Sequence, residues 1–384
     1  MREVFIIGVG STDYGVLPYT AVELASQASI EAMRDAGVKA KEIEALYVGA
    51  CQASYGNTQL HIAPIIATDL GIANIACTRI ESACVTGGIA FREAYIAVAG
   101  GFYDMVLVAA TESVSKMSTP RATEQFAVGG DYLYEARAGV TFPAFFALAA
   151  QDHIRRYKTT KVQMAQVAVK NHRNAMSNPH AQFRKEISLD KVMKSFVVAE
   201  PLRFLDCCPF SDGAAAAVLV SEKFMERVKK PIKIIGSGQA ADYAIFHERE
   251  SLSTMLSTVR AAEQAHKQAG IKPGDVDFAE VHDCFTIAEI MASEDLGFFK
   301  KGEGGPAAEA GETAIGGKIP INPSGGLKAK GHPVGATGVG QIYELVMQLR
   351  GEAEGRQVKD AEIGLAHNSG GSGATCTVHI LRRV

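Results

Sequence analysis

The first hundred residues alternate between short apolar runs and longer segments with helical spacing of apolar residues. VFIIG at 4–8 and ALYVG at 45–49 have the length of buried strands. Between them, residues 21–36 have the apolar spacing of a helix, and Gly37 follows as a helix-ending residue. Strands that alternate with helices are typical of α/β folds, so the pattern predicts a covered, largely parallel sheet.

The second half of the chain repeats this order. IKIIGSGQA at 232–240 corresponds to VFIIGVGST, and a helix predicted at about 254–269 corresponds to the first helix. FAEVHDCF at 278–285 corresponds to ALYVGACQ, and a glycine-rich loop around His332 stands where the loop around Cys84 stood. Two similar βαβαβ halves are the simplest interpretation.

A third region separates the two halves. From 113 to 206 the pattern becomes an irregular mixture of Gly, Pro and aromatic residues with two polar helices, which predicts an inserted cap. The first half is then 1–112 plus 207–228, and the second half is 229–384. A chain of 384 residues is long enough for two or three packed domains.

Composition and charge argue against several classes of protein. The net charge is -3 without a dense basic run, so we expect no nucleic-acid partner. The most apolar stretch, 84–110, is interrupted by Arg92, Glu93 and Asp104, so we expect no membrane span. No export signal is visible at the start, and the seven cysteines form no CxxC pair. We therefore expect reduced thiols, a cytoplasmic location and no metal site.

Cys84 is the first candidate for chemistry. It lies in IESACVTGG, between a predicted strand and a predicted helix. Free N–H groups and the dipole at a helix N-terminus would lower its thiol pKa and make it a nucleophile. The alternative is a buried structural thiol. The other cysteines outside the 278–285 segment lack this setting and are expected to be structural: Cys51, Cys77, Cys207, Cys208 and Cys376.

His332 is the second candidate. It lies among six glycines in NPSGGLKAKGHPVGATGVG, where backbone can approach a ligand closely and an imidazole can move protons. The glycine spacing resembles a P-loop, but His332-Pro333 replaces the Lys-Ser/Thr pair, so a phosphate loop is not predicted. GSGQAA at 236–241 matches only a relaxed dinucleotide fingerprint, and we do not predict NAD binding.

Two further segments offer polar groups. VHDCF places His282 and Cys284 two residues apart after an apolar strand, where both can face one cleft. A core strand end with a chance histidine is the alternative. HNSGGSGAT at 367–375 offers backbone N–H groups, including that of Gly370, that can hold an oxyanion.

IESACVTGG, VHDCF, GGLKAKGHPVGATG and NSGGSGAT, in this order and spacing, resemble the reactive loops of thiolases. The resemblance covers essentially the whole chain, and HDCF makes it most similar to the sterol-carrier-type and archaeal acetoacetyl-CoA thiolases. It implies a layered αβαβα core of two halves with an inserted cap. Many thiolases open their C-terminal CxGGG loop with a second catalytic cysteine, where this sequence has Asn368.

The resemblance also implies an activity, the reversible ping-pong condensation of two acetyl-CoA to acetoacetyl-CoA and CoA. Cys84 would carry the acyl group, and His332 would take its proton. His332 and His282 would hold the thioester oxygen of the second acetyl-CoA. The N–H groups of Cys84 and Gly370 would hold the acyl oxygen. Cys284 would be the acid/base that replaces the missing cysteine.

The same resemblance implies that coenzyme A is substrate and product, that no other cofactor is needed, and that the cap binds it. Phe142 or Phe145 would border the acyl pocket. The expected assembly is a homodimer or a dimer of dimers. Archaeal relatives suggest a complex with hydroxymethylglutaryl-CoA synthase and a small zinc-ribbon protein, in mevalonate synthesis. A degradative 3-ketoacyl-CoA thiolase, a malonyl-dependent ketoacyl synthase and an inactive CoA-binding scaffold remain alternatives.

Overall fold

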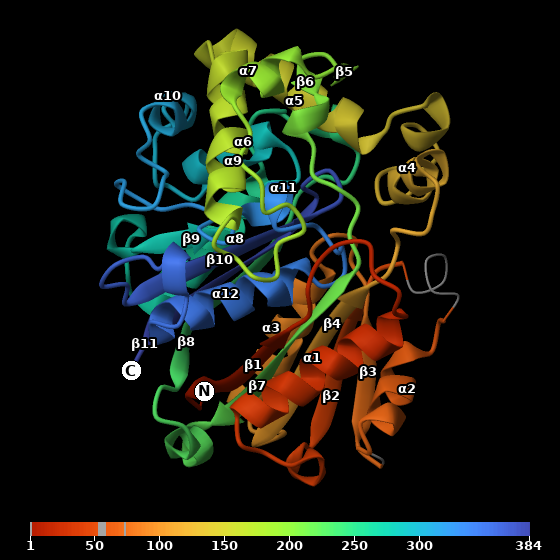
Figure 1. Ribbon diagram of the computed structural model, residues 1–384, viewed down its shortest axis with the longest axis vertical. Helices are drawn as coiled ribbons and strands as arrows, with labels where there is room; N and C mark the ends of the chain where they lie inside the picture. The colour runs from red at the N-terminus through yellow and green to blue at the C-terminus, as the bar shows by residue number, and fades with distance from the viewer. Residues whose placement is uncertain (1, 53–58, 73) are drawn as a thin grey trace.

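The computed structural model describes residues 2–52, 59–72 and 74–384 (Figure 1). Within these residues, one mixed sheet of nine strands runs through both halves of the chain. Its strands, in spatial order, are β3 (Ala76–Ile80), β2 (Ala45–Ala50), β4 (Met105–Glu112), β7 (Gly213–Ser221), β1 (Val4–Ser11), β8 (Ile232–Ala241), β11 (Thr375–Arg383), β10 (Ile363–Gly370) and β9 (Phe278–Glu280). Outward from the centre, the first half has β1, β7, β4 and β2, and the second half has the corresponding strands β8, β11, β10 and β9 in the same order. This order confirms the predicted repeat, to which the first half adds β3 at its edge.

The expectation of a largely parallel sheet is wrong. Among the described strands, only β2–β3, β2–β4 and β9–β10 are parallel pairs, whereas the pairs that involve β1, β7, β8 and β11 are antiparallel. The cause is the last strand of each half. β11 follows β10 after only four residues, a connection too short for a parallel crossover, and β7 returns antiparallel between β4 and β1.

Helices form layers around the two halves of this sheet. The helices are α1 (Ala21–Asp35), α2 (Ile62–Asp69), α3 (Thr86–Ala99), α8 (Leu256–Ala269) and α12 (Thr337–Arg350). One apolar core joins α3 and α12 to strands of both halves, while separate cores bury α1 with α2 on the first half and α8 on the second. The layers are therefore α, β, α, β, α, with α3 and α12 in the middle.

The GxG segments of β1 and β8 have a packing role in this arrangement. A Cβ on Gly10 would lie 2.2 Å from the Ala28 carbonyl oxygen of α1. A Cβ on Gly238 would lie 2.0 Å from the Ala261 carbonyl oxygen of α8. The second glycine of each GxG segment thus lets a helix backbone approach its strand closely, at the same place in each half.

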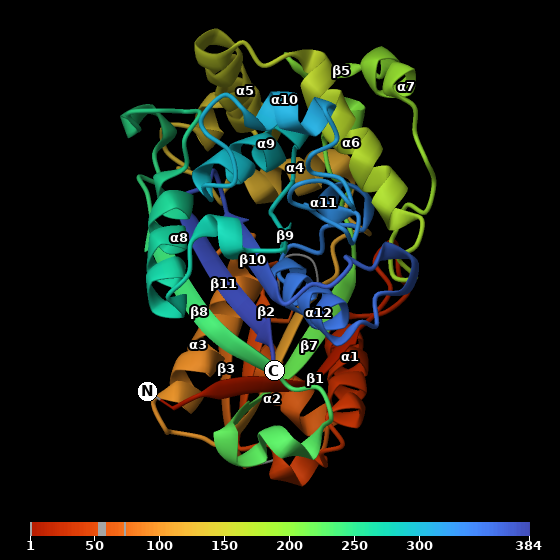
Figure 2. The same cartoon turned by 90° about the vertical axis from the view of Figure 1, so that its left-hand side faces the viewer.

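The segment between β4 and β7 lies over one end of the sheet, at the top of Figures 1 and 2. It contains α4 (Thr119–Ala127), α5 (Phe142–Tyr157), α6 (Lys161–Ala175), α7 (Leu189–Lys194) and a small sheet of β5 (Val197–Ala199) and β6 (Leu202–Arg203). The second half adds α9 (Thr286–Asp295), α10 (Gly304–Glu309) and α11 (Gly326–Ala329) beside it. Apolar side chains of α5, α6 and α9 share one core, so the cap is packed against the second half. The division by residue number stays a prediction.

Among the described residues, no helix has both the length and the apolar character needed to cross a membrane.

Candidate active site

Three side chains that are far apart in the sequence converge between the two halves. The Sγ atom of Cys84 and one ring nitrogen each of His282 and His332 all lie within 4.8 Å of one another. The two imidazole rings stand edge to face, with centroids 5.0 Å apart. Both histidines are buried and Cys84 is half-buried. A thiol beside an imidazole is the pairing that nucleophilic catalysis requires.

A tight turn between β3 and α3 presents Cys84. Ala83, the residue before it, has φ +50°, a left-handed conformation that is strained for a residue with a Cβ. The Thr86 hydroxyl holds the turn, since it donates to the Ala83 carbonyl oxygen at 2.6 Å and accepts the Ser82 N–H at 2.8 Å. The strain is thus stabilised by local hydrogen bonds at the position where the nucleophile is needed.

The predicted lowering of the Cys84 pKa is wrong. Burial raises the pKa of this thiol to about 12, although the N–H of Gly371 lowers it and so opposes part of that effect. The nearby Glu112 carboxylate raises it further. Desolvation therefore outweighs the helix N-terminus, and the resting sulfur is a thiol that needs a base.

His332, the imidazole next to this thiol, is held by hydrogen bonds to its backbone and its ring. Its backbone N–H donates to Ser211 Oγ at 2.9 Å, and its Nδ1 lies 2.7 Å from Thr337 Oγ1. The Thr337 hydroxyl uses its single hydrogen on the Pro333 carbonyl oxygen at 3.1 Å, so it accepts from Nδ1. Burial lowers the pKa of His332 to about 3. The ring is therefore neutral, with a free lone pair on Nε2.

Glu112 is a site residue that the sequence analysis missed. It ends β4, and its carboxylate accepts the backbone N–H of Gln52 at 3.1 Å and that of Gly335 at 3.0 Å. Burial raises its pKa to about 7. The carboxyl group thus joins the first half to the His332 loop. An acidic residue at the end of the apolar run MVLVAATE was the only sequence signal for this role.

Cys284 lies beside the three converging groups rather than among them. Its side chain is buried among apolar residues of the cap and α9, and burial raises its thiol pKa well above the usual value. The thiols of Cys208 and Cys84 add to that increase. The Cys208 N–H donates to the Cys284 carbonyl oxygen at 3.0 Å. Cys208 is therefore a second thiol near the site, which the sequence analysis did not single out.

The C-terminal loop closes the site from β10. Gly370 lies against the Cys84 turn, because a Cβ there would be 2.7 Å from Val85 Cγ1 and 2.8 Å from the Ser82 carbonyl oxygen. Only glycine fits this approach. The side chain of Asn368, two residues earlier, lies between the same turn and His282, 3.1 Å from the Cys84 carbonyl oxygen.

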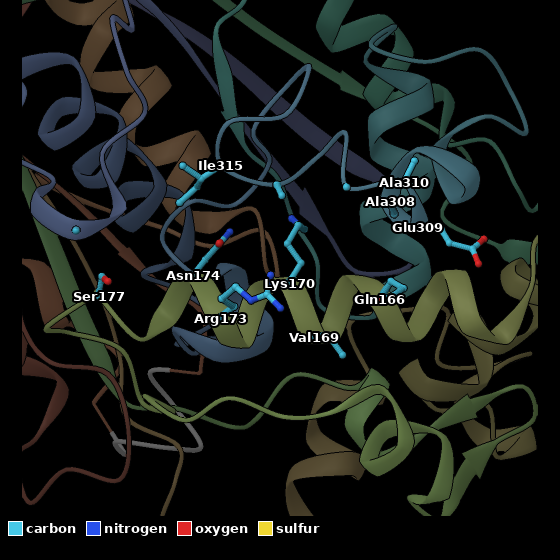
Figure 3. Close-up of a pocket in the computed structure, with 13 residues that line it drawn as sticks. Gln166, Val169, Lys170, Arg173, Asn174, Ser177, Ala308, Glu309, Ala310 and Ile315 are labelled. Atoms are coloured by element: carbon cyan, nitrogen blue, oxygen red, sulfur yellow. The ribbon is translucent and has the colours of Figure 1, made fainter.

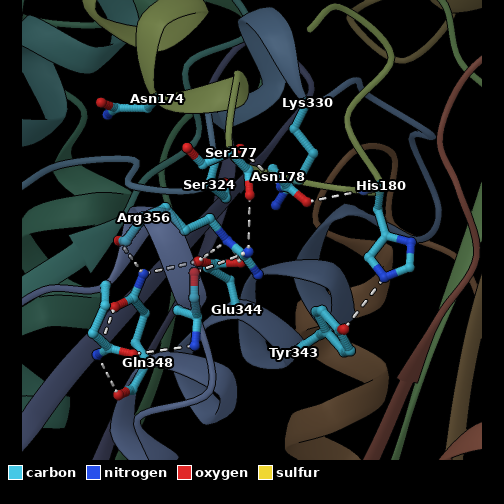
Figure 4. A network of polar contacts seen from close by, with 12 residues as sticks. Asn174, Ser177, Asn178, His180, Ser324, Lys330, Tyr343, Glu344, Gln348 and Arg356 are labelled. Carbon is cyan, nitrogen blue, oxygen red and sulfur yellow. Dashed lines mark hydrogen bonds and ion pairs between the residues drawn. The ribbon is translucent and has the colours of Figure 1, made fainter.

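Buried polar groups fix the loop that carries His332. The Asp283 carboxylate accepts the backbone N–H of Leu327 at 2.6 Å and that of Lys328 at 3.2 Å, which ties α11 to the His282 loop. On α12, which follows that loop, Glu344 pairs with Arg356 at 2.9 Å (Figure 4). Charges buried in such pairs resist displacement, since separation would leave one of them unpaired.

The acyl side of the site is apolar. Phe142 and Cys84 both pack against the small core that contains Phe126 and Val334. Phe145 instead packs edge to face on Phe246, with ring centroids 5.0 Å apart. Of the two phenylalanines suggested by the sequence, Phe142 is the one that shares a core with the nucleophile.

A separate cavity of about 490 Å³ lies along α6 (Figure 3). Lys170, Arg173 and Asn174 line it, together with the segment from Ala308 to Ile315. Cys84 and the two histidines do not line it. The candidate site is therefore identified by the convergence of its side chains and not by the volume of this cavity.

Comparison with known proteins agrees with this geometry. Residues 4–223 match the family model "Thiolase, N-terminal domain", and residues 238–383 match "Thiolase C-terminal domain-like". The chain is 46% identical to an acetyl-CoA acetyltransferase of Methanothermobacter thermautotrophicus, with 100% of both chains covered. It is 35% identical to human sterol carrier protein 2, over 97% of this chain and 71% of that protein.

Solved structures agree as well. The fold is similar to the "Ltp2-ChsH2(DUF35) aldolase", with a TM-score of 0.86, 26% identity, and 99% of this chain and 97% of that chain covered. An acetyl-CoA acetyltransferase from Syntrophomonas wolfei has the same fold, with a TM-score of 0.75 at 21% identity, over 100% and 99% of the two chains. The chain therefore belongs to the thiolase family and is an acyltransferase of that family.

Proposed function

We propose that this thiolase condenses two acetyl-CoA molecules to acetoacetyl-CoA and free CoA, by a reversible reaction through acyl-Cys84. The observation that carries the proposal is the convergence of Cys84, His282 and His332 within 4.8 Å. The identity of 46% with an archaeal acetyl-CoA acetyltransferase supports the choice of acetyl-CoA as substrate.

The first half-reaction needs a base and an oxyanion hole. His332 Nε2 takes the Cys84 proton as the sulfur attacks the thioester carbonyl, and the same proton then leaves with the CoA thiolate as free CoA. The backbone N–H groups of Cys84 and Gly370 hold the oxygen that becomes negative. Phe142 borders the acetyl group on the apolar side.

The second half-reaction needs an enolate. Cys284 gives its thiol proton to His332 Nε2; His282 and the protonated His332 then hold the thioester oxygen of the second acetyl-CoA while the Cys284 thiolate takes a proton from its α-carbon. The α-carbon then attacks acetyl-Cys84, and the C–S bond breaks as the new C–C bond forms. His332 returns its proton to the Cys84 thiolate, which becomes a thiol again, and acetoacetyl-CoA leaves. The cap at 113–206 binds the CoA portion, and coenzyme A serves as substrate and product, with no additional cofactor needed.

Assembly is part of the proposal. β3 is an edge strand of the sheet, with backbone groups on one side unpaired by any described residue. Such an edge favours pairing with a second copy, so we propose a homodimer or a dimer of dimers. The resemblance to archaeal relatives supports a cytoplasmic complex with hydroxymethylglutaryl-CoA synthase and a small zinc-ribbon protein, in which acetoacetyl-CoA feeds mevalonate synthesis.

Two assays test the function. Incubation with acetyl-CoA should add one acetyl group to the peptide that contains Cys84, as detected by mass spectrometry, and Cys84→Ala should not be labelled there. Thiolysis should be fastest with acetoacetyl-CoA and slower with longer 3-ketoacyl-CoA. A preference for long chains would favour the degradative alternative, and the absence of any labelling would favour the inactive scaffold.

A further inference from the structure

Two backbone groups determine which end of the Asn368 amide is the oxygen and which is the nitrogen. The Gly88 N–H, which can only donate, lies 3.2 Å from Asn368 Oδ1. The Cys84 carbonyl oxygen, which can only accept, lies 3.1 Å from Asn368 Nδ2. The oxygen and nitrogen of the amide are therefore assigned by their partners, on opposite sides of the side chain.

The remaining Asn368 N–H determines the state of His282. Asn368 Nδ2 lies 3.0 Å from His282 Nδ1, and its second hydrogen points to that ring nitrogen. His282 Nδ1 must therefore accept, so it carries a lone pair. His282 is buried and neutral and has one ring hydrogen, which is then on Nε2, the nitrogen left free to face the converging groups.

We propose that Asn368 is a positioning residue that fixes the Nε2–H tautomer of His282 and so makes that histidine a hydrogen-bond donor to the substrate oxygen. The inference rests on the proposed function for the identity of that oxygen. His332 has the opposite arrangement, because Thr337 accepts from its Nδ1 and leaves a lone pair on Nε2. Two adjacent neutral imidazoles are thereby given different tasks, one as donor and one as base.

The same tautomer makes the three converging groups a weaker metal site than their residue types suggest. A thiol and two imidazoles within 4.8 Å are a donor set that suits zinc. A ring nitrogen that carries a hydrogen has no lone pair for a metal. As long as Asn368 donates to Nδ1, His282 cannot complete the set with its Nε2 atom.

The direct test is NMR of the wild-type protein labelled with ¹⁵N-histidine. Long-range ¹H–¹⁵N correlations distinguish a protonated ring nitrogen from an unprotonated one, and His282→Gln identifies the signals of His282. We expect an unprotonated Nδ1 and a protonated Nε2 in His282, and the reverse in His332, which is the control in the same spectrum. A protonated Nδ1 in His282 overturns the proposal.

Asn368→Asp tests the consequence with almost no change of size. A carboxylate still accepts the Gly88 N–H, but it cannot donate, so it favours a hydrogen on His282 Nδ1 and a lone pair on Nε2. We expect exchange of acetyl-CoA methyl protons with deuterated water to fall about a hundred- to thousandfold, as for loss of one oxyanion donor. Acetylation of Cys84 should persist, and binding of Zn²⁺ alone should strengthen at least tenfold.

Asn368→Ala is the matched control. It removes the donor but leaves His282 free to adopt either tautomer, so its exchange rate should lie between those of the wild type and Asn368→Asp. If Asn368 served only to fill space, Asn368→Ala would be the more damaging change, and that order overturns the proposal. Failure of Cys84 acetylation in the wild type would count against the proposed function alone, because the NMR result does not depend on turnover.

Discussion

At the scale of single residues, the site is built from groups whose charged states are suppressed. The pKa of Cys84 is raised to about 12 and that of His332 is lowered to about 3, both chiefly by burial. At neutral pH the resting pair is therefore a thiol and a neutral imidazole, not a thiolate and an imidazolium. Proton transfer then accompanies attack on the thioester, when hydrogen bonds to the new oxyanion compensate for the charge.

This protonation state predicts the reactivity of Cys84 toward iodoacetamide. Since the thiolate is the nucleophile and the thiol pKa is about 12, alkylation should increase roughly tenfold per pH unit from about pH 6 to 9, without a plateau. The measurement is mass spectrometry of the peptide that contains Cys84 at each pH. A rate that is constant across this range would mean a preformed thiolate, contrary to our account.

The acid/base role proposed for Cys284 leads to a second prediction at this scale. Cys284→Ala should abolish most exchange of acetyl-CoA methyl protons with deuterated water while acetylation of Cys84 continues, because only the second step needs this thiol. Cys208→Ala is the matched control, since Cys208 is the neighbouring thiol and its backbone contact to Cys284 does not require its side chain. Exchange lost in Cys208→Ala but retained in Cys284→Ala would move the base to Cys208.

His367 is less suited to be that base. The His282 backbone N–H donates to its Nδ1 at 3.3 Å, and its Nε2 lies 2.9 Å from Thr258 Oγ1. Both ring nitrogens are therefore occupied by protein groups.

The sequence singled out three residues that converge in the fold, but not their environment. Cys84 and His282 could be found because each lies at a strand-to-helix turn, and His332 because it lies in a glycine-rich loop. The direction of the Cys84 pKa shift was wrong because burial depends on segments far along the chain. The contacts of Glu112 and Asn368 also join segments more than fifty residues apart, and no local pattern reports them.

At the scale of elements, periodicity predicted the strands and helices well but not the strand directions. The predicted strands at 4–8 and 45–49 and the helix at 21–36 agree with β1, β2 and α1 to within a few residues. The direction of β7 and β11 depends on where each strand enters the sheet, and apolar runs look the same in either direction.

Glu112 gives a prediction at the scale of elements, since it ties β4 to the His332 loop. Its pKa is raised from 4.5 to about 7, so the folded state binds this proton more tightly than the unfolded state does. Its contribution to stability is therefore greatest below about pH 4.5 and decreases as pH rises to about 7. A pKa shift of this size corresponds to a change of roughly 3 kcal/mol in the free energy of unfolding.

Glu112→Gln removes the titration and keeps an oxygen acceptor. The free energy of unfolding of the wild type, minus that of Glu112→Gln, should therefore decrease between pH 5 and pH 8, as measured by urea denaturation at both pH values. A difference that is constant with pH, or that increases, would contradict the raised pKa. Acetylation of Cys84 should also slow in the variant, because Gly335 positions the His332 loop.

At the scale of the whole molecule, the two ends of the sheet have different surroundings. The side chains of β9, the outermost strand of the second half, are buried, whereas those of β3 at the other end of the sheet are exposed or half-buried. An exposed edge strand next to the nucleophile turn favours pairing with another copy, and the proposed dimer would then support the Cys84 turn in both subunits.

Thr78→Asp tests this assembly. Thr78 is the central residue of β3 and is exposed in the single chain, so in an antiparallel pairing of two β3 strands centred on it, the two aspartates would face each other. Like charges directly opposite in a strand pair are destabilising. We expect the variant to shift toward monomer in sedimentation velocity at low salt and to recover partly at high salt, where the repulsion is screened.

Val16→Asp, at an exposed position outside the strands, is the control and should sediment like the wild type. A Thr78→Asp protein that keeps the wild-type sedimentation coefficient at micromolar concentration in low salt would place the interface elsewhere than β3.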